Sequence, residues 1–408
     1  MKLTYRSTKL ACKFGSIIQA ISVMMPSVLF IIFQEDYGVS YAELGTLVLM
    51  TFVVQIGVDY FLSKTTHLLN TRSVMMFSCI LPIAGYLVMA LTPVIFKNHI
   101  YFGLILACLL YSGGSGINEV MTSPLTDAMP SDDKGSSMAF LHSFYCWGCL
   151  GAVLTVTLLL KLLGRANWQW IPIILMLVPI FDLILFSLSP FPVMVTGHEE
   201  DNGKKLLKSG IFWAAMMVMI GSGASEIAMS QWASMFTQKA LGINKTWGDI
   251  LGPCFFSLIM GFGRLFYGFK GDKLNMRKAL IISGAMCIVS YAIVIFSPVQ
   301  ALSLVGMGLC GLSVAMMWPG TLVLSAKEMP KGGTQMFALL ALGGDIGCSA
   351  GPWITGLATD RLAVTNLNSV FQLSSDQFAL RGGLLMSIGF PVLLLIFVPI
   401  LTKERKSE

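Results

Sequence analysis

The side chains of this sequence with the clearest chemical potential are charged groups inside apolar stretches. Glu119 follows the apolar run 101–111 and lies about eight residues, or about 12 Å of helix, before Asp127. A carboxylate in hydrocarbon is unfavourable unless it meets water, a partner or a proton. His142 lies at a similar depth in the next apolar stretch, so the two groups could share one proton near neutral pH. We predict proton binding at Glu119 and His142. The alternative is a structural carboxyl beside a histidine that bonds a backbone carbonyl.

A second acidic residue, Glu226, follows the small-residue run 221–225, GSGAS. This pattern predicts a helix that is unwound or closely packed beside a cavity, and Glu226 is a third candidate for proton coupling. Gln231 could hydrogen-bond hydroxyl groups, while Trp232 could stack on the apolar face of a sugar or act as an anchor at the membrane interface. The remaining side chains that could line a substrate cavity are Gln19, Ser22, Gln55, Asn118, Trp147 and Trp318.

Arg264 is the one basic residue that is predicted to be buried in a helix. We expect a structural ion pair between Arg264 and Asp345, with Glu328 as a competing partner. Glycines at 343, 347 and 351 predict a face for close helix packing next to Asp345. Two further acidic residues, Asp59 and Asp182, lie nearer the ends of their stretches, where side chains can reach water, and no role is predicted for them.

The elements that must position these groups are membrane helices. The 408 residues are 55% hydrophobic and 12% charged, with a mean hydropathy of +0.76, which leaves no room for a large soluble domain. Because a helix needs about 20 apolar residues to cross a bilayer, the sequence predicts an all-α membrane protein with twelve transmembrane helices. The predicted spans are 11–34, 41–62, 73–95, 100–126, 135–160, 168–190, 211–237, 247–269, 277–297, 300–325, 335–359 and 382–402.

The sequence contains no pattern typical of an enzyme: no ATP-binding loop, haem ligand pattern, metal cluster or nucleophile elbow. The nine cysteines are scattered through apolar segments, which predicts free thiols. Cys146 and Cys149 form a CxxC inside a predicted span, where packing is the simpler interpretation. We therefore expect no cofactor and no metal. The net charge of +6 is spread over short loops and requires no nucleic-acid partner.

The longest internal polar linker, 198–208, divides the predicted spans into two sets of six. The predicted domains are an N-terminal six-helix bundle at 1–197, a cytoplasmic linker at 198–209 and a C-terminal six-helix bundle at 210–408. With the N-terminus inside, the cytoplasmic segments hold 19 of the 27 Lys and Arg residues and the external loops hold seven. The positive-inside rule therefore predicts that both termini are cytoplasmic.

Near-equal offsets between the two sets of spans predict a duplicated unit. Asn70-Thr71-Arg72 precedes Asn275-Met276-Arg277 by 205 residues, and Met129-Pro130 precedes Met329-Pro330 by 200. Gly151 precedes Gly351 by the same 200 residues. Two pseudo-symmetric halves with a substrate site between them near the midplane are typical of membrane transporters.

The segment 263–278, GRLFYGFKGDKLNMRK, resembles the loop signature of the major facilitator superfamily, with Asn275 where a second Gly is usual. In that superfamily the loop latches cytoplasmic helix ends, which implies gating roles for Asp272 and Arg277. The first-half copy has His67 in place of the Asp. The resemblance also implies that spans 1, 4, 7 and 10 line the transport path.

The segment 118–124, NEVMTSP, is similar to the fourth helix of the fucose–proton symporter family, where a Glu lies five residues before a Pro. The resemblance implies that Glu119 binds sugar or carries the coupling proton. The family places an Asp four residues before the proline of helix 1, but this sequence has Ser22 there. We expect Glu226 to take over the missing acidic role.

These observations together predict a monomeric secondary transporter in a bacterial inner or plasma membrane, which uses protons to import a sugar, a polyol or a related polar small molecule. The first competing hypothesis is a proton-coupled exporter of drugs or metabolites, although the fifth span lacks the proline-containing segment usual in such antiporters. The sequence is also compatible with an importer of nucleosides or organic acids and with a non-transporting sensor. The lipid bilayer and a small-molecule substrate are the predicted partners.

Overall fold

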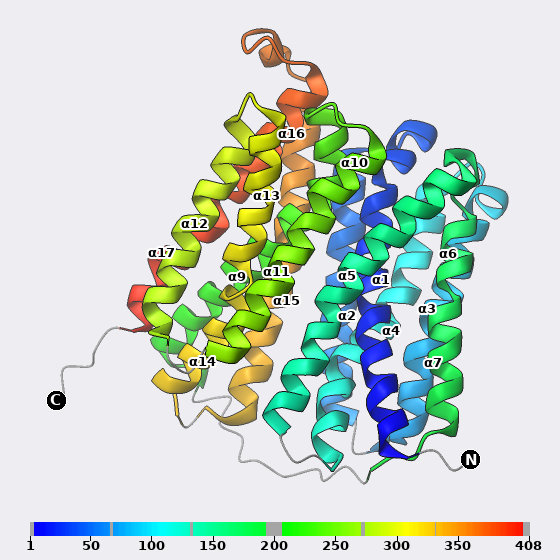
Figure 1. Ribbon diagram of the computed structural model, residues 1–408, viewed down its shortest axis with the longest axis vertical. Helices are drawn as coiled ribbons and strands as arrows, with labels where there is room; N and C mark the ends of the chain where they lie inside the picture. Colours follow the sequence, from blue (N-terminus) through cyan, green and yellow to red (C-terminus); the bar gives the residue numbers. More distant parts are fainter. Residues whose placement is uncertain are drawn as a thin grey trace. The chain divides into compact units, whose positions relative to one another are not determined.

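A computed structural model describes residues 4–65, 68–130, 134–192, 206–270, 274–330 and 332–402. These residues form helices, with no strand in the described ranges (Figure 1). The elements are α1 (Tyr5–Tyr37), α2 (Tyr41–Thr65), α3 (Thr71–Ile95), α4 (Ile100–Ala128), α5 (Lys134–Leu163), η2 (Arg165–Asn167), α6 (Trp170–Leu175), α7 (Leu177–Leu188), α9 (Gly210–Met235), η3 (Phe236–Ala240), α10 (Lys245–Asp249), η4 (Ile250–Cys254), α11 (Phe255–Lys270), α12 (Met276–Phe296), α13 (Gln300–Val314), α14 (Met317–Glu328), α15 (Gly333–Ala363), η6 (Asn366–Ser369), α16 (Ser375–Ser387) and α17 (Gly389–Leu401).

Twelve helical stretches of the described chain are long and apolar enough to cross a membrane, which confirms the predicted fold class. Each contains a window of 18 residues with high hydropathy and at most two charged side chains. The stretches are Tyr5–Tyr37, Tyr41–Leu62, Thr71–Ile95, Ile100–Ala128, Phe140–Leu163, Trp170–Leu188, Gly210–Ala240, Lys245–Tyr267, Met276–Phe296, Gln300–Glu328, Gln335–Ala363 and Ser375–Leu401.

The chain forms two compact units, Met1–Glu43 with Met50–Gly197 and Leu44–Leu49 with His198–Glu408. In the first unit, α1 packs against α4, α5 and α7, and α3 packs along α4. Glycine allows that last contact, since a Cβ on Gly85 would lie 2.7 Å from the backbone nitrogen of Tyr111. The long first helix α1 is therefore positioned by three neighbours, and α4 is fixed on both α1 and α3.

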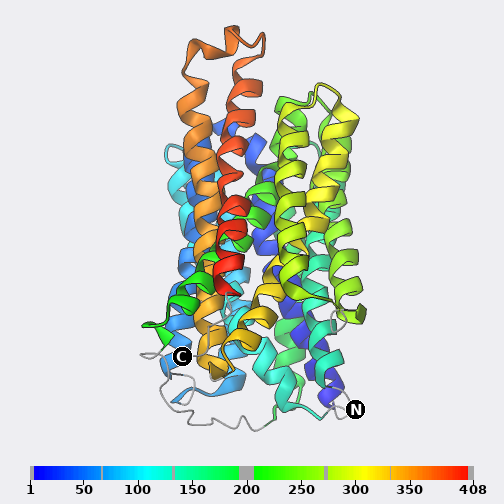
Figure 2. The same ribbon diagram turned by 90° about the vertical axis from the view of Figure 1, so that its left-hand side faces the viewer.

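In the second unit, α9 packs against α15 and α17, and α15 packs against α16; Figure 2 shows α15 in orange beside the red C-terminal helices. The predicted glycine face makes the α9–α15 contact. A Cβ on Gly351 would lie 2.8 Å from the carbonyl oxygen of Ala224, and one on Gly347 would overlap the carbonyl of Ile220. Helix α9 is continuous from Gly210 to Met235 and ends in the π-helical turn η3, so it is closely packed and not unwound.

The local structure repeats between the two units at the predicted positions. The side chains of Asn70 and Asn275 cap the N-termini of α3 and α12, accepting hydrogen bonds from the backbone N–H groups of residues 73 and 278. Met129 and Met329 directly follow the last residues of α4 and α14. The structure adds a further pair, 205 residues apart. The buried hydroxyl of Tyr86 lies 2.8 Å from that of Ser22, and the buried hydroxyl of Tyr291 donates to the Ser225 carbonyl at 2.9 Å.

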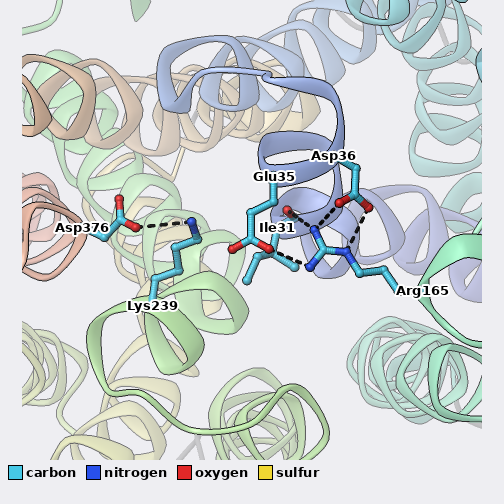
Figure 3. Close-up of polar contacts among 6 residues, drawn as sticks. All are labelled: Ile31, Glu35, Asp36, Arg165, Lys239 and Asp376. Atoms are coloured by element: carbon cyan, nitrogen blue, oxygen red, sulfur yellow. Dashed lines mark hydrogen bonds and ion pairs between the residues drawn. The ribbon is translucent and has the colours of Figure 1, made fainter.

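Ion pairs connect residues at the exposed ends of different helices. Figure 3 shows the guanidinium of Arg165 between Glu35 and Asp36 at the end of α1, with the shortest distances 2.6 Å and 2.7 Å. Partial burial opposes the charge, but the hydrogen bonds to Asp36 and Glu35 raise the pKa of Arg165 above its ordinary value. In the second unit, Lys239 lies 3.3 Å from Asp376 (Figure 3).

All nine cysteines are free and buried, which agrees with the expectation of unpaired thiols. Cys146 and Cys149 lie inside α5, each 1% exposed, as packing residues would. Within the described ranges no group of three or more His, Cys, Asp or Glu side chains could hold a metal ion.

Candidate functional site

The polar cluster of the first unit is centred on Glu119. Its side chain lies nine residues before the end of α4 and is partly buried. The amide of Gln19, on α1, donates a hydrogen bond to Glu119 Oε2 at 3.0 Å. The sequence predicts a substrate contact for Gln19, and the structure instead gives it a direct contact with the predicted proton-binding carboxyl. The two helices thus present one carboxyl and one amide to each other within the span.

Helix α2 brings a second carboxyl to this cluster. Gln55 on α2 donates to the Ser115 hydroxyl on α4 at 2.9 Å, and both side chains are buried. One helical turn further along each helix are Asp59 and Glu119, so α2 adds a second carboxyl at the level of Glu119. Asp59 Oδ1 is buried and accepts no hydrogen bond within the described part of the chain. The expectation that Asp59 reaches water near its helix end is therefore wrong for this oxygen.

His142 lies beside α4, but at the turn after Glu119. Its Nε2 is 3.4 Å from the Ser123 hydroxyl, four residues from Glu119, and the imidazole is exposed. The helices α4 and α5 do bring the two predicted residues to the same region. A proton shared directly between His142 and Glu119 stays a prediction.

Two of the predicted substrate contacts are held inside the first bundle. Ser22 is 1% exposed and bonds the Tyr86 hydroxyl. Asn118 is also 1% exposed, and its Oδ1 accepts a hydrogen bond from Ser78 at 2.9 Å, at the point where Gly15 of α1 comes close. These contacts favour packing roles, since neither side chain is open to a solute in this conformation. Trp147 lies on α5 and is partly buried.

The cluster of the second unit is an ion pair. Arg264 Nη2, on α11, donates to both carboxylate oxygens of Glu226 on α9, at 3.0 Å and 2.9 Å. The Arg264 side chain is 23% exposed and that of Glu226 is 9% exposed. The predicted partner of Arg264 is Asp345, and the structure adds Glu226 as a partner that the sequence does not indicate. Asp345 is 2% exposed within α15, and its contact with Arg264 stays a prediction.

Two tryptophans of the second unit contact α15. Trp232 is fully buried and donates its indole N–H to the Pro352 carbonyl at 3.1 Å, so it is not an interfacial anchor. Trp318, on α14, is partly buried and occupies the space above Gly344, where a Cβ would overlap the indole ring. Gln231 is 1% exposed beside Trp232. Of these three side chains, that of Trp318 is the most accessible.

The loop motif is only partly described. Asp272 lies outside the described residues, so its predicted gating contact has no structural counterpart here. Arg277 is exposed in the first turn of α12, directly after the Asn275 cap. Its first-unit counterpart Arg72 donates to the backbone carbonyls of Ser187 and Ser189, at 2.6 Å and 2.9 Å. An arginine at this position can therefore fasten a neighbouring helix end.

Asp182 is the acidic residue most at odds with its predicted environment. It lies on α7 and is fully buried, whereas the sequence predicts access to water near the helix end. The thiol of Cys79 is 3.8 Å from Asp182 Oδ2, while Oδ1 accepts no hydrogen bond from the described residues. Its surroundings are the apolar core that includes Met75, Met121 and Phe186. Asp182 therefore belongs to the bundle core and not to the polar cluster around Glu119.

No role is predicted for Asp59 from the sequence, although two features of the sequence indicate one. Asp59 follows Gln55 by one helical turn, and Gln55 is predicted to face a cavity. It also precedes Arg264 by 205 residues, the offset that relates Asn70 to Asn275. The repeat therefore places a charged residue at the same position of α2 and α11.

Comparison with known proteins identifies relatives over most of the chain. The family model described as Major Facilitator Superfamily matches residues 14–352. The chain is 24% identical over 358 residues to the membrane protein MosC of Rhizobium meliloti, and the matched region covers 84% of this chain and 80% of that protein.

Solved structures share the fold at lower identity. A D-xylose-proton symporter is 14% identical, with a TM-score of 0.80 and coverage of 98% of this chain and 99% of that chain. The E. coli fucose:proton symporter is 12% identical, with a TM-score of 0.63 and coverage of 99% and 100%. The nucleoside transporter NupG is 13% identical, with a TM-score of 0.77 and coverage of 97% and 100%.

Proposed function

The chain belongs to the Major Facilitator Superfamily, and from this premise we propose that it couples the uptake of a sugar, polyol or related polar small molecule to the entry of protons. Membership of a transporter family and similarity to solved transporters indicate a transport role and not an enzymatic one. The proton as coupling ion, the direction of transport and the substrate class are the parts of the proposal that need a test.

One observation carries the proton coupling: Glu119 lies within a span and has no basic partner among the described residues. Glu226, the other acidic candidate for proton coupling, is neutralised by Arg264. A carboxyl inside a membrane that lacks a cationic partner must be hydrated or hold a proton. Glu119 can therefore alternate between a charged and a neutral form, while Glu226 is better suited to a fixed ion pair.

Gln19 gives this alternation a structural consequence. Its amide donates to the Glu119 carboxylate and so joins α1 to α4 when the acid is charged. Protonation weakens that hydrogen bond, because hydrogen bonds to ionised groups are stronger than those to neutral ones. If protonation and substrate binding favour the same conformation, each raises the affinity for the other. Alternating access then carries the proton and the substrate across the membrane together.

The substrate class is supported by the side chains and by the structural neighbours. Two neighbours are named as symporters of xylose and fucose with protons, and a third is named as a nucleoside transporter. Trp318 offers a partly exposed aromatic surface on α14 of the second unit. Such a surface suits a ligand with an apolar face. Together with the two sugar symporters among the neighbours, it favours a sugar or polyol and keeps nucleosides as the second candidate.

Uptake into proteoliposomes with an imposed proton gradient tests the proposal. The purified protein is offered labelled sugars, polyols, nucleosides and organic acids, with and without a protonophore. We expect saturable accumulation of a sugar or polyol that the protonophore abolishes. Uptake of a nucleoside but of no sugar or polyol would change the substrate class. Accumulation that is unaffected by the protonophore would contradict proton coupling.

The Glu119→Gln variant tests the residue that carries the proposal. We expect it to lose proton-driven accumulation while exchange of substrate across the membrane continues, because the amide retains a polar contact for Gln19 but cannot bind a proton. Glu328→Gln, the same substitution at the end of α14, is the matched control and should transport normally. Normal accumulation by Glu119→Gln would remove the coupling role from this residue.

A further inference from the structure

Asp59 on α2 and Glu119 on α4 each follow, by four residues, the hydrogen-bonded pair Gln55 and Ser115 of the first unit. We propose that Asp59 and Glu119 bind the coupling proton together, as a pair of carboxyls that shares one proton. This inference rests on the proposed function, because it takes Glu119 as the proton-binding residue. It adds a second residue to the site and assigns a stoichiometry of one shared proton to the pair.

The register of α2 against α4 places Asp59 and Glu119 at the same level of the two helices. Gln55 and Ser115 are hydrogen-bonded at 2.9 Å, and Asp59 and Glu119 each follow by four residues. As the second and fourth spans, α2 and α4 cross the membrane in the same direction. Residues four apart lie on the same face of a helix. A step of one turn along both helices therefore takes the contact from Gln55 and Ser115 to the two acids.

The helices α2 and α4 come close together about one turn before Glu119. A Cβ on Gly116 would lie 3.1 Å from the Cα of Gln55 and 3.1 Å from the Cβ of Val58. Thr51, one turn earlier on α2, has its hydroxyl 3.3 Å from the sulfur of Cys108, about two turns earlier on α4. Gly116 is therefore a point of close approach, and Asp59 lies four residues after Gln55, on the same side of α2.

One buried oxygen of the two acids lacks a hydrogen-bond donor, and a single proton would supply it. Gln19 donates to Glu119 Oε2, but Asp59 Oδ1 is buried and receives no donor within the described ranges. Two ionised carboxyls side by side in a medium of low dielectric constant repel each other strongly, so such pairs hold one proton. A proton that enters from water and forms an O–H bond on either acid supplies the missing donor and removes the repulsion.

The surrounding elements bring few other charges to the pair. From α1, Lys13 lies over the rings of Phe140 and Phe144, at 4.3 Å and 5.4 Å from their centres. From α5, His142 contacts Ser123, one turn beyond Glu119. From α3, Ser78 meets α4 at this level with an uncharged hydroxyl. The side chain of Lys64, at the end of α2, is outside the described residues.

The second unit also carries a charged residue at this position of the repeat, and there it meets a carboxyl on α9. Arg264 stands 205 residues after Asp59 and pairs with Glu226. In the second unit the position carries a base, so the carboxyl it meets is neutralised permanently. In the first unit it carries an acid, so this position provides no fixed cation for a neighbouring carboxyl.

Labelling with dicyclohexylcarbodiimide tests the pair without knowledge of the substrate, because this apolar reagent reacts with protonated carboxyls. The purified protein is treated near neutral pH, and modification of Glu119 is measured by mass spectrometry. We expect modification of Glu119 to fall about tenfold in Asp59→Asn, which corresponds to about 1.4 kcal/mol of coupling. Asp59→Glu should retain the modification, and Asp127→Asn, an exposed acid on the same helix as Glu119, is the matched control.

Three outcomes are informative. Equal modification of Glu119 with and without Asp59 would overturn the shared proton, even if Glu119→Gln loses proton-driven accumulation and the proposed function stands. Protection of Glu119 by sodium but not by potassium would also overturn it, since a metal cation would then occupy the pair. A fall of modification in Asp59→Asn together with normal accumulation by Glu119→Gln would support the pair and contradict the proposed function. If Asp59→Glu retains the modification, the loss in Asp59→Asn is due to the missing carboxyl and not to a disturbed fold at this position.

Discussion

Glu119 and Glu226 are both acidic residues inside membrane spans, but they have different partners. Glu226 receives two hydrogen bonds from Arg264, whereas Glu119 receives one from the neutral amide of Gln19. An ion pair away from water depends on both partners, since loss of one leaves an uncompensated charge. The stability of the second unit should therefore depend on the Glu226–Arg264 pair far more than the first unit depends on Gln19.

Arg264→Met should destabilise the protein by about 3–5 kcal/mol, because Glu226 would remain buried without its cation. The free energy of unfolding in mixed detergent micelles measures the loss. The double variant Arg264→Met with Glu226→Gln should recover part of it, and the double-mutant cycle gives the coupling energy of the pair.

Arg277→Met is the matched control, because Arg277 is exposed at the start of α12 and should change stability by no more than about 0.5 kcal/mol. If Arg264→Met were no more destabilising than this control, the ion pair would contribute nothing measurable to the fold.

The sequence predicted which residues of the site carry charge but not which of them meet. Glu119 and Glu226 were recognised because a carboxyl within an apolar stretch is unusual. The contacts of Gln19 with Glu119 and of Arg264 with Glu226 depend on how each helix is rotated about its own axis. These helices are apolar on most sides, so the sequence pattern does not determine that rotation. Asp59 has no predicted role for this reason, since distance from a helix end says nothing about the direction of a side chain.

At the level of helices, glycine determines how closely α9 and α15 approach. Gly351 touches the backbone of Ala224, and Gly347 touches that of Ile220. Without large side chains, the backbones of two membrane helices can come into direct contact. The glycine spacing in the sequence predicted this face of α15, and the structure supplies α9 as its partner.

Gly351→Ala should destabilise the protein by about 1–3 kcal/mol, because its Cβ would lie 2.8 Å from the Ala224 carbonyl oxygen and 3.0 Å from its Cα. Gly151→Ala is the matched control at the corresponding position of the first unit, where no atom lies within 4 Å of the added Cβ. There the higher helix propensity of alanine should stabilise α5 by up to about 1 kcal/mol. Thermal unfolding of the two variants in one detergent compares them.

Equal shifts of Tm in the two variants would contradict this difference in packing. The sequence presents Gly151 and Gly351 as equivalent members of a repeat, since they are 200 residues apart. Only the structure separates them, because the environment of a glycine depends on the neighbouring helix. Likewise, the spans were predictable from their apolar length, whereas the π-helical turns η3 and η4 within two spans were not.

For the whole molecule, the distribution of Lys and Arg makes a prediction about orientation. We expect the N- and C-termini and the linker 198–209 to be cytoplasmic, because 19 of the 27 basic residues fall on that side. Alkaline phosphatase fused after Glu408 should be inactive in intact bacteria, while green fluorescent protein at the same site should fluoresce. Phosphatase inserted at Val370, an exposed residue beyond α15, should be active. The reverse pattern would invert the predicted topology.

The twelve spans and the repeat were predictable because both leave local marks in the sequence. Apolar length predicts the number of spans, and recurring caps such as Asn70 and Asn275 mark equivalent helix starts. The Tyr86 and Tyr291 pair obeys the same offset, yet two tyrosines in apolar segments are too common to be noticed without their hydrogen bonds. Sequence repetition thus indicates the duplicated unit, and the structure identifies the contacts that the duplication preserved.

The shielding of all nine native thiols makes this chain a suitable starting point for distance measurements. A single cysteine introduced at an exposed position would be the reactive thiol, so the native cysteines need not be removed first. Leu68 and Val370 are exposed by 73% and 74% and are suitable positions. Spin labels or fluorophores attached to such pairs would report changes of distance in an otherwise natural protein. The conformational cycle can therefore be followed without the loss of packing that replacing nine buried side chains would cause.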